Sequence, residues 1–591
     1  MERILHRTRS KSISSNMVAT TGHDYLSSLR AATTASAQCL LHVEGLTVGY
    51  RDPDGEQMLA VDGVTLQLAG GEAVGLLGES GSGKTTLGLT LLGLLPPTAI
   101  IMRGSAVFRG EELLTLGERE FQKLRGAAIS MVYQEPGSAL NPVLRVGQQI
   151  AEVIRAHRPF TRERAGEEAS LLLALVGFPK EMCISAAYPH QLSGGQQQRV
   201  AIAQAIAARP ALLIADEPTT ALDRVTQLGI LDLLASLREK LQLALLLISH
   251  DPYVLARTVD RIVVMRNGRI VDQGPTRDLV LNAEQAYTQT LLKSSQASKR
   301  YGRNFSSPGS VSTESSPEHT DSLASEPATL LSAVHLQKSY VQGRWPSANR
   351  LQVHALRGVD LKLHTGSTLA LIGVSGSGKS TLARCLACLE RPDSGEIWFE
   401  RTNLTDLSHR ELIPFRRQIQ LVFQDPGSSL NPHFTALEVI SEPLLTVALG
   451  SKKQWRERAL ELMELVGLPS DSEKRLPHQF SAGQRRRLAI ARALAAKPKV
   501  LILDEALTGL DLPVQAQIAE LLRELQARLS LTYLYISHDL GLMSQLADQV
   551  IVLHQGQIIE AATPLELFAK PQSVAASNLV RASFELCSSG D

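Results

Sequence analysis

The sequence predicts an α/β fold of two tandem domains, each built around a mainly parallel β-sheet. Two glycine-rich loops share one pattern, GESGSGKTT at residues 78–86 and GVSGSGKST at residues 373–381. In each half an apolar run, ALLIADEP or VLILDEAL, ends in acids, as expected of a buried strand that delivers carboxylates to the C-terminal edge of a sheet. Short β-rich runs alternate with longer helical patterns. Because these landmarks recur in the same order, they indicate a duplicated domain rather than short repeats.

Length and composition limit the functional classes. A chain of 591 residues is too long for one hydrophobic core. The 44% hydrophobic and 20% charged residues are typical of a globular protein, and a net charge of +1 favours neither nucleic acid nor an anionic membrane as the main partner. Five cysteines fit a reducing compartment rather than a disulfide framework. No apolar run reaches the ~18–20 residues of a membrane span.

The composition also divides the chain. Residues 1–40 are rich in Ser, Thr, Ala and Arg, and we expect a disordered extension or a translation start assigned too early, with Met17 as the true start. An organellar transit peptide is the less favoured alternative. The first domain is predicted at 41–292 and the second at 329–580. A Ser/Pro-rich linker at 293–328 and a C-terminal tail at 581–591 complete the chain.

The glycine-rich loops predict phosphate binding. Glycines let the backbone curl so that successive N–H groups point at phosphate oxygens beside a helix N-terminus. The lysines would reach the β- and γ-phosphates, and the hydroxyls of Thr85 and Ser380 would hold Mg²⁺. The predicted nucleotide contacts are Gly78, Glu79, Ser80, Gly81, Ser82, Gly83, Lys84, Thr85 and Thr86 in the first loop, and Gly373, Val374, Ser375, Gly376, Ser377, Gly378, Lys379, Ser380 and Thr381 in the second.

The acidic pairs predict catalysis. Asp216 and Asp504 suit a role at Mg²⁺, and the adjacent Glu217 and Glu505 are placed to polarise an attacking water. A pair of acids can also simply open a helix, where the dipole favours them. Their position behind a phosphate loop favours the catalytic interpretation.

Further motifs resemble those of the ATP-binding cassette (ABC) ATPases. LSGGQQQR at 192–199 and FSAGQRRR at 480–487 are similar to the family's signature sequence. Taken singly, a glutamine, histidine or tyrosine of these motifs would more often be structural, but each recurs at a matched position in both halves. The matches cover nearly all of the chain outside the N-terminal extension and the linker. They are Gln134 and Gln424 of the Q-loop, Asp223 and Asp511 of the D-loop, the switch histidines His250 and His538, and the adenine-stacking tyrosines Tyr50 and Tyr340.

The resemblance implies two P-loop NTPase domains, each with an antiparallel β part and a helical subdomain that carries the signature. In the family, two such domains pair head to tail, so that each ATP lies between one phosphate loop and the opposite signature. Site one would join the first loop, Glu217 and His250 to the second signature. Site two would join the second loop, Glu505 and His538 to the first signature. The resemblance assigns Gln134 and Gln424 to Mg²⁺ as well, and the signature contacts are Ser193, Gly194, Gly195, Gln196, Ser481, Ala482, Gly483 and Gln484.

One departure lies in the second signature, where Ala482 replaces the usual glycine. Its methyl group would either displace the phosphate cradle or be absorbed by a backbone with negative φ. Both glutamates and both histidines are present, so we expect two hydrolytic sites, with site one the weaker.

The regions at 134–150 and 424–440, and AYTQTLL at 286–292, resemble the importer branch for oligopeptides, dipeptides, nickel and, in fused forms, glutathione. This implies ATP and Mg²⁺ as ligands, two transmembrane permease subunits and a solute-binding protein as partners, and a peripheral location at the cytoplasmic face of the inner membrane, without nucleic acid. The second half ends without a YT-type tail, and the cysteine-bearing extension of some relatives is missing, so we expect no iron–sulfur cluster.

Two alternatives stay open from the sequence. One is a twin-cassette ATPase without a permease, acting in translation or DNA repair, and the other is a scaffold that binds ATP without turnover. The Ser/Pro linker and the importer-like segments argue against the first, and the intact glutamates and histidines against the second. Cys385 and Cys388 favour helix-core packing over a redox or metal role.

Overall fold

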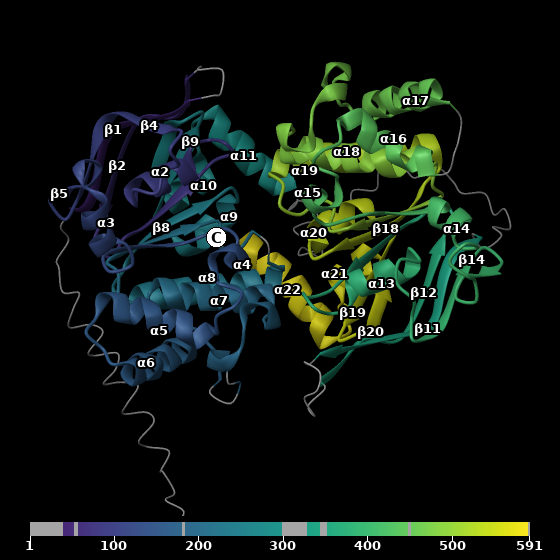
Figure 1. Cartoon of the computed structure of the whole chain (residues 1–591), viewed down its shortest axis with the longest axis horizontal. Coiled ribbons are helices and arrows are strands. Elements are labelled where there is room, and N and C mark those ends of the chain that lie inside the picture. Colours follow the sequence, from purple (N-terminus) through teal and green to yellow (C-terminus); the bar gives the residue numbers. More distant parts are fainter. Residues whose placement is uncertain are drawn as a thin grey trace, which may run out of the picture.

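The computed structural model consists of two halves with the same architecture, lying side by side (Figure 1). It describes residues 39–51, 57–179, 182, 184–220, 222–297, 328–342, 351–446 and 451–588. We call residues 39–297 the first half and residues 328–588 the second half. The predicted N-terminal extension up to residue 38 and the predicted linker from residue 298 to 327 lie outside the described residues, as do residues 589–591.

Each half contains a six-stranded, mainly parallel sheet. Strands β3, β7 and β8 are buried along their whole length, which explains their continuous apolar sequence. Only the edge pair of each sheet, β9 with β10 and β19 with β20, is antiparallel. In spatial order the first sheet is β10 (Arg269–Pro275), β9 (Arg261–Arg266), β3 (Ala73–Leu77), β8 (Ala244–Ser249), β7 (Leu212–Asp216) and β6 (Ile129–Val132). The second is β16 (Ile419–Val422), β17 (Val500–Asp504), β18 (Thr532–Ser537), β13 (Thr368–Ile372), β19 (Gln549–His554) and β20 (Gln557–Ala562).

A separate antiparallel sheet of four strands completes the β part of each half. The first comprises β2 (Gln57–Ala69), β1 (Cys39–Arg51), β4 (Ala99–Phe108) and β5 (Glu111–Glu112), in that order. The second comprises β12 (Leu351–His364), β11 (Thr329–Gln342), β14 (Ser394–Phe399) and β15 (Thr402–Asn403). Buried residues of both sheets of a half form one core cluster, so the antiparallel sheet is fastened to the parallel one by apolar packing.

Helices join the parallel strands and form a helical subdomain in each half. The connecting helices are α2 (Lys84–Leu91), α8 (Arg224–Leu241) and α9 (Pro252–Thr258), matched by α13 (Lys379–Leu386), α19 (Leu512–Leu529) and α20 (Leu540–Leu546). In the subdomains α5 (Val146–His157) packs on α6 (Arg162–Leu175) and α7 (Gly194–Ala205), and α16 (Ala436–Thr446) packs on α17 (Lys452–Leu465) and α18 (Ala482–Ala495). The shorter helices are α3 (Glu118–Leu124), α4 (Pro136–Ala139), α10 (Thr276–Asn282), α14 (Ile413–Gln418), α15 (Pro426–Ser429) and α21 (Pro564–Ala569). The predicted fold class is confirmed.

The last helix of each half crosses to the other half. Helix α11 (Ala286–Ala297) packs on α19, and α22 (Val574–Ser588) packs on α8 and α9 (Figure 1). Ala582 of α22 belongs to a core cluster of the first half and is buried there. Both helices continue past the predicted domain ends at residues 292 and 580.

Among the described helices, we find none with both the length and the apolar character needed to cross a membrane.

Candidate functional site

The two phosphate loops adopt the same conformation. Gly83 and Gly378 precede α2 and α13 with φ of 100° and 107°, in the left-handed region that glycine tolerates. A Cβ on Gly83 would lie 2.1 Å from the carbonyl oxygen of Ala60, and one on Gly378 would lie 2.3 Å from that of Ala355. Glycine is therefore required at both positions by space as well as by conformation.

Each loop closes around its lysine. Lys84 Nζ donates to the carbonyl oxygens of Gly78 and Glu79 at 2.7 and 2.8 Å, and Lys379 Nζ donates to those of Gly373 and Val374 at 2.8 and 3.0 Å. Burial lowers the pKa of both lysines, opposed by the carboxylates of the neighbouring acids. An ammonium ringed by loop backbone at a helix N-terminus is an arrangement that binds phosphate.

Glu217 and Glu505 follow strands β7 and β17 in a strained conformation. Their φ values are 43° and 47°, although neither residue is glycine. Hydrogen bonds from their backbone N–H groups to the carbonyl oxygens of Ile248 and Ile536, at 3.0 and 2.9 Å, hold this geometry. Strain retained in this way is common at functional sites.

The predicted glutamine and histidine converge on each glutamate. Gln134 Nε2 donates to Glu217 Oε2 at 3.1 Å, and His250 Nδ1 lies 3.2 Å from Glu217 Oε1. In the second half Gln424 Nε2 donates to Glu505 at 2.7 Å, and His538 Nδ1 lies 3.7 Å from it. Burial alone would raise the pKa of Glu217, but the histidine, together with Thr220 and Lys84, lowers it overall. The lowered pKa favours the ionised carboxylate, which is the form that a general base requires.

The aspartates at the ends of β7 and β17 lie beside the loop hydroxyls. Ser380 Oγ donates to Asp504 Oδ1 at 3.2 Å, and the Thr85 hydroxyl bonds to Asp216. Within the described part of the chain, Asp216 Oδ1 is buried without a hydrogen-bond partner. Burial raises the pKa of both aspartates. A carboxylate oxygen left bare beside a hydroxyl fits Mg²⁺, which prefers oxygen ligands.

The D-loop aspartates cross between the halves. Asp511 accepts hydrogen bonds from the backbone N–H and the hydroxyl of Ser80 in the first phosphate loop, at 3.1 and 3.3 Å. Asp223 accepts one from the backbone N–H of Ser375 in the second loop, at 3.2 Å. These reciprocal contacts place each phosphate loop against the D-loop of the opposite half.

Both signature segments open a helix with a serine cap. Ser193 and Ser481 accept hydrogen bonds from the backbone N–H groups of Gln196 and Gln484, and each glutamine side chain accepts from the backbone N–H of its serine. Such a reciprocal capping box fixes the first turn of α7 and α18.

Ala482 fits into its helix without backbone strain. It is the first residue of α18, and a Cβ on its counterpart Gly194 would meet Leu222 at 3.6 Å, an ordinary contact. The next position behaves differently, because a Cβ on Gly195 would lie 2.3 Å from Thr226 Cγ2, and one on Gly483 2.6 Å from Val514 Cγ1. In each signature, the glycine directly before the glutamine, Gly195 or Gly483, is the one that is sterically required.

The tyrosines of the predicted adenine site lie in the antiparallel sheets, on β1 and β11. The hydroxyl of Tyr50 lies 3.3 Å from Thr86 Oγ1 of the first phosphate loop, so the ring is close to that loop. The Tyr340 ring packs under the ammonium of Lys338, 5.8 Å from its centroid. Their adenine-stacking role stays a prediction.

Sequence reasoning missed several residues that shape the sites. Thr220 donates to Glu217 Oε2 at 2.8 Å. Arg486, in the signature helix α18, donates to the carbonyl oxygens of Phe423 and Gln424 at 2.9 and 2.8 Å and so holds the second Q-loop. Gln198 occupies the matching position of the first signature, and its buried Nε2 has no partner among the described residues. The signal in the sequence that could have revealed Arg486 was the difference between QQQR in the first signature and QRRR in the second.

Cys385 lies in α13 and Cys388 lies two residues after its end, and both are buried in a core cluster of the second half. Burial raises the pKa of the Cys385 thiol to about 12 and that of Cys388 to about 11. Both thiols are thus protonated apolar packing groups at neutral pH.

Comparison with known proteins agrees with this geometry. The model of the ABC transporter family matches residues 61–220 and 356–508. The chain is 39% identical over 546 residues to the glutathione import ATP-binding protein GsiA of Salmonella paratyphi A, covering 90% of this chain and 88% of that protein. It is 38% identical over 559 residues to the peptidoglycan transport ATP-binding protein YejF of Agrobacterium fabrum, covering 93% and 97%. It is 40% identical over 540 residues to the uncharacterized ABC transporter ATP-binding protein YejF of Escherichia coli K12, covering 90% and 98%. With two family matches, relatives aligned along almost the whole chain and both halves folded alike, the chain belongs to the ABC transporter family.

Proposed function

We propose that this chain is the ATP-hydrolysing, energy-coupling component of an importer for peptides or related small solutes. ABC ATP-binding proteins hydrolyse ATP to power transport. The observation that carries the proposal is the reciprocal contact of Asp511 with Ser80 and of Asp223 with Ser375. Each phosphate loop contacts the D-loop of the opposite half, which supports a pair of cassettes supplied by one chain.

Each composite site would work by positioning and electrostatics. The loop N–H groups and Lys84 or Lys379 bind the β- and γ-phosphates, and the opposite signature serine completes the cradle. Glu217 or Glu505 accepts a proton from the attacking water, and His250 or His538 holds that carboxylate in place. The glutamines Gln134 and Gln424 link each glutamate to the helical subdomain. Tyr50 and Tyr340 are the proposed contacts to adenine.

The residues beside the phosphate loops fit Mg²⁺. Thr85 with Asp216, and Ser380 with Asp504, would hold the ion, with Gln134 and Gln424 as further ligands. When bound, Mg²⁺ neutralises charge that develops on the phosphates during transfer. The bare, buried Oδ1 of Asp216 is the atom that supports this assignment most directly.

Coupling to transport would use closure of the two halves. ATP bound between a phosphate loop and the opposite signature favours the closed state, and hydrolysis releases that preference. We propose two separate transmembrane permease subunits and a solute-binding protein as partners, with the chain peripheral at the cytoplasmic face of the inner membrane. The import and transport functions named for the relatives favour this over a permease-free ATPase in translation or DNA repair.

Two measurements test the proposal. The purified full-length chain should release phosphate from Mg-ATP, and the double variant E217Q/E505Q should lower turnover by about a hundredfold or more. In the source organism, deletion of the gene should reduce uptake of radiolabelled glutathione or of a labelled oligopeptide, and the wild-type gene but not the double variant should restore it. Unchanged uptake of both solutes, or hydrolysis that survives both substitutions, would overturn the proposal.

A further inference from the structure

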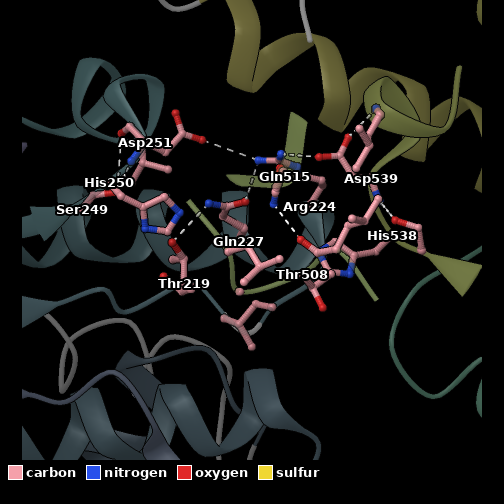
Figure 2. A pocket seen from close by; sticks show the side chains of 18 residues that line it. Thr219, Arg224, Gln227, Ser249, His250, Asp251, Thr508, Gln515, His538 and Asp539 are labelled. Carbon is pink, nitrogen blue, oxygen red and sulfur yellow. Dashed lines mark hydrogen bonds and ion pairs between the residues drawn. The ribbon is translucent and has the colours of Figure 1, made fainter. Parts of the chain in front are cut away.

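Arg224 lies in the contact between the halves, on the first turn of α8 directly after the D-loop aspartate. Its Nη2 donates to Asp539 Oδ2 of the second half at 2.8 Å, and its Nη1 lies 3.7 Å from Asp251 Oδ2 of the first half. Figure 2 shows the guanidinium between the two carboxylates, in a small cavity of about 70 Å³ that residues of both halves line. One cation thus bridges two aspartates from opposite halves.

Both aspartates fix the turn that carries a switch histidine. Asp251 follows His250 and caps α9 by accepting from the backbone N–H of Tyr253 at 2.9 Å. Asp539 follows His538 and caps α20 by accepting from the backbone N–H of Leu542 at 3.1 Å. The position of each histidine relative to its glutamate therefore depends on where the adjoining aspartate is held.

The carboxylates of Asp251 and Asp539 are poorly solvated and depend on the positive charge of Arg224. The side chains of Arg224, Asp251 and Asp539 are only 22%, 16% and 17% exposed. Burial alone would raise the pKa of Asp539, but Arg224 and the cap hydrogen bond lower it overall. Without the guanidinium, two poorly solvated carboxylates would face the same cavity with no shared cation, which favours separation of the halves.

Within the described part of the chain the bridge occurs at one place, although most of the site is duplicated. Helices α8 and α19 both start directly after a D-loop aspartate, with Arg224 first in α8 and Leu512 first in α19. A leucine cannot pair with either carboxylate. Among the described residues, Arg224 of the first half is the side chain that pairs with an aspartate of both histidine turns.

We propose that Arg224 is a positioning residue that fastens both switch-histidine turns when the halves pair, so that hydrolysis at both composite sites depends on this one side chain. The two states are the paired and the separated halves, because the Arg224–Asp539 contact forms only when the halves are paired. The proposal rests on the hydrolytic roles proposed for Glu217 and Glu505.

The test uses the full-length chain with one site silenced at a time. Arg224→Leu, which installs the residue found at position 512, is combined with E505Q, which leaves site one, and with E217Q, which leaves site two. We expect kcat to fall by about tenfold in both backgrounds, with the KM for ATP changed less than about threefold. Arg224→Lys should restore more activity at site two than at site one, because a lysine keeps the shorter contact to Asp539 but cannot span both carboxylates.

A matched control is Arg257→Leu, which removes an arginine of α9 that pairs with Asp232 of α8 at 2.9 Å within the first half. This variant should keep kcat within about twofold in both backgrounds, because exposed pairs contribute little. A loss of kcat with Arg224→Leu in only one background, or in neither, overturns the proposal.

A double-mutant cycle tests the bridge without either glutamate substitution. In the otherwise unchanged chain, Arg224→Leu and Asp539→Asn should be strongly non-additive in kcat, because each removes the same contact. Additive losses overturn the bridge. If instead E217Q/E505Q still hydrolyses ATP while the cycle is non-additive, the proposed glutamate roles fail and the bridge stands. Should Arg224→Leu not fold, judged by thermal unfolding, Arg224→Gln, which also removes the cation, replaces it in the cycle with the same criterion.

Discussion

Asp511 of the second half accepts two hydrogen bonds from Ser80 of the first, from its backbone N–H at 3.1 Å and its hydroxyl at 3.3 Å. The counterpart Asp223 accepts from Ser375 but also caps its own helix through the backbone N–H of Thr226 at 3.0 Å. Asp511 makes no such cap contact. Both carboxylate oxygens of Asp511 thus bond to the opposite phosphate loop, whereas the carboxylate of Asp223 bonds both to the opposite loop and to its own helix.

This difference predicts distinct effects of alanine substitution. Asp511→Ala should lower hydrolysis at site one about tenfold, since a charge-assisted contact to the loop is lost, with little change in stability. Asp223→Ala should lower hydrolysis at site two and also cost about 1 kcal/mol of unfolding free energy through the lost helix cap. Phosphate release in single-site backgrounds and denaturant titration measure the two quantities. Equal stability losses would contradict the assignment.

The second prediction concerns the inequality of the two sites. We expect E505Q to reduce total turnover more than E217Q, because Ala482 of the second signature places a methyl group where site one is completed. Because Ala482 causes no backbone strain, we attribute the inequality to the methyl group itself, at the place where the signature completes site one. A482G should therefore raise turnover at site one, and G194A should lower turnover at site two. Steady-state phosphate release measures both. Equal effects of E505Q and E217Q would contradict the inequality.

The neighbouring glycine supplies the control for that experiment. A Cβ on Gly195 would lie 2.3 Å from Thr226, so G195A should cost about 1–3 kcal/mol of unfolding free energy, whereas G194A should be nearly neutral. Denaturant titration distinguishes a loss of folding from a loss of turnover. If G194A is as destabilising as G195A, its effect on activity does not report on the nucleotide.

A third prediction concerns the second Q-loop. Arg486 bonds to the carbonyl oxygens of Phe423 and Gln424, and glutamine stands at the matching position of the first half, so R486Q installs the residue of the other half. We expect kcat at site two to fall several-fold, while site one changes little, because only Gln424 loses its support. Turnover in the E217Q and E505Q backgrounds measures this. An equal fall at both sites would indicate a general loss of stability instead.

The buried thiols predict a pH effect. Because burial raises the pKa of Cys385 to about 12, the folded chain keeps that proton where the unfolded chain releases it. The contribution to stability is therefore complete below the ordinary thiol pKa of about 9 and is lost as pH rises toward 12. At mildly alkaline pH, iodoacetamide should label the exposed Cys39 but neither Cys385 nor Cys388 until denaturant is added, as mapped by mass spectrometry. Rapid labelling of Cys385 in the folded chain would contradict this.

Much of each half was predictable because its determinants are local in sequence. The apolar runs ALLIADEP and VLILDEAL contain β7 and β17, and the structure buries both strands along their whole length. The glycines of the phosphate loops and the serine caps of the signature helices act within a few residues of themselves. The domain ends were less predictable, because α11 and α22 continue along partners from the opposite half.

The sequence by itself determined the duplicated α/β architecture, the phosphate loops and the identity of the residues around each glutamate. The tertiary structure alone decided that Ala482 fits without strain, that Arg486 supports only one Q-loop, and that Arg224 joins Asp251 to Asp539. The physical reason is separation along the chain. Local motifs specify backbone conformation and chemistry residue by residue, whereas a contact between side chains of opposite halves exists only after both have folded and paired.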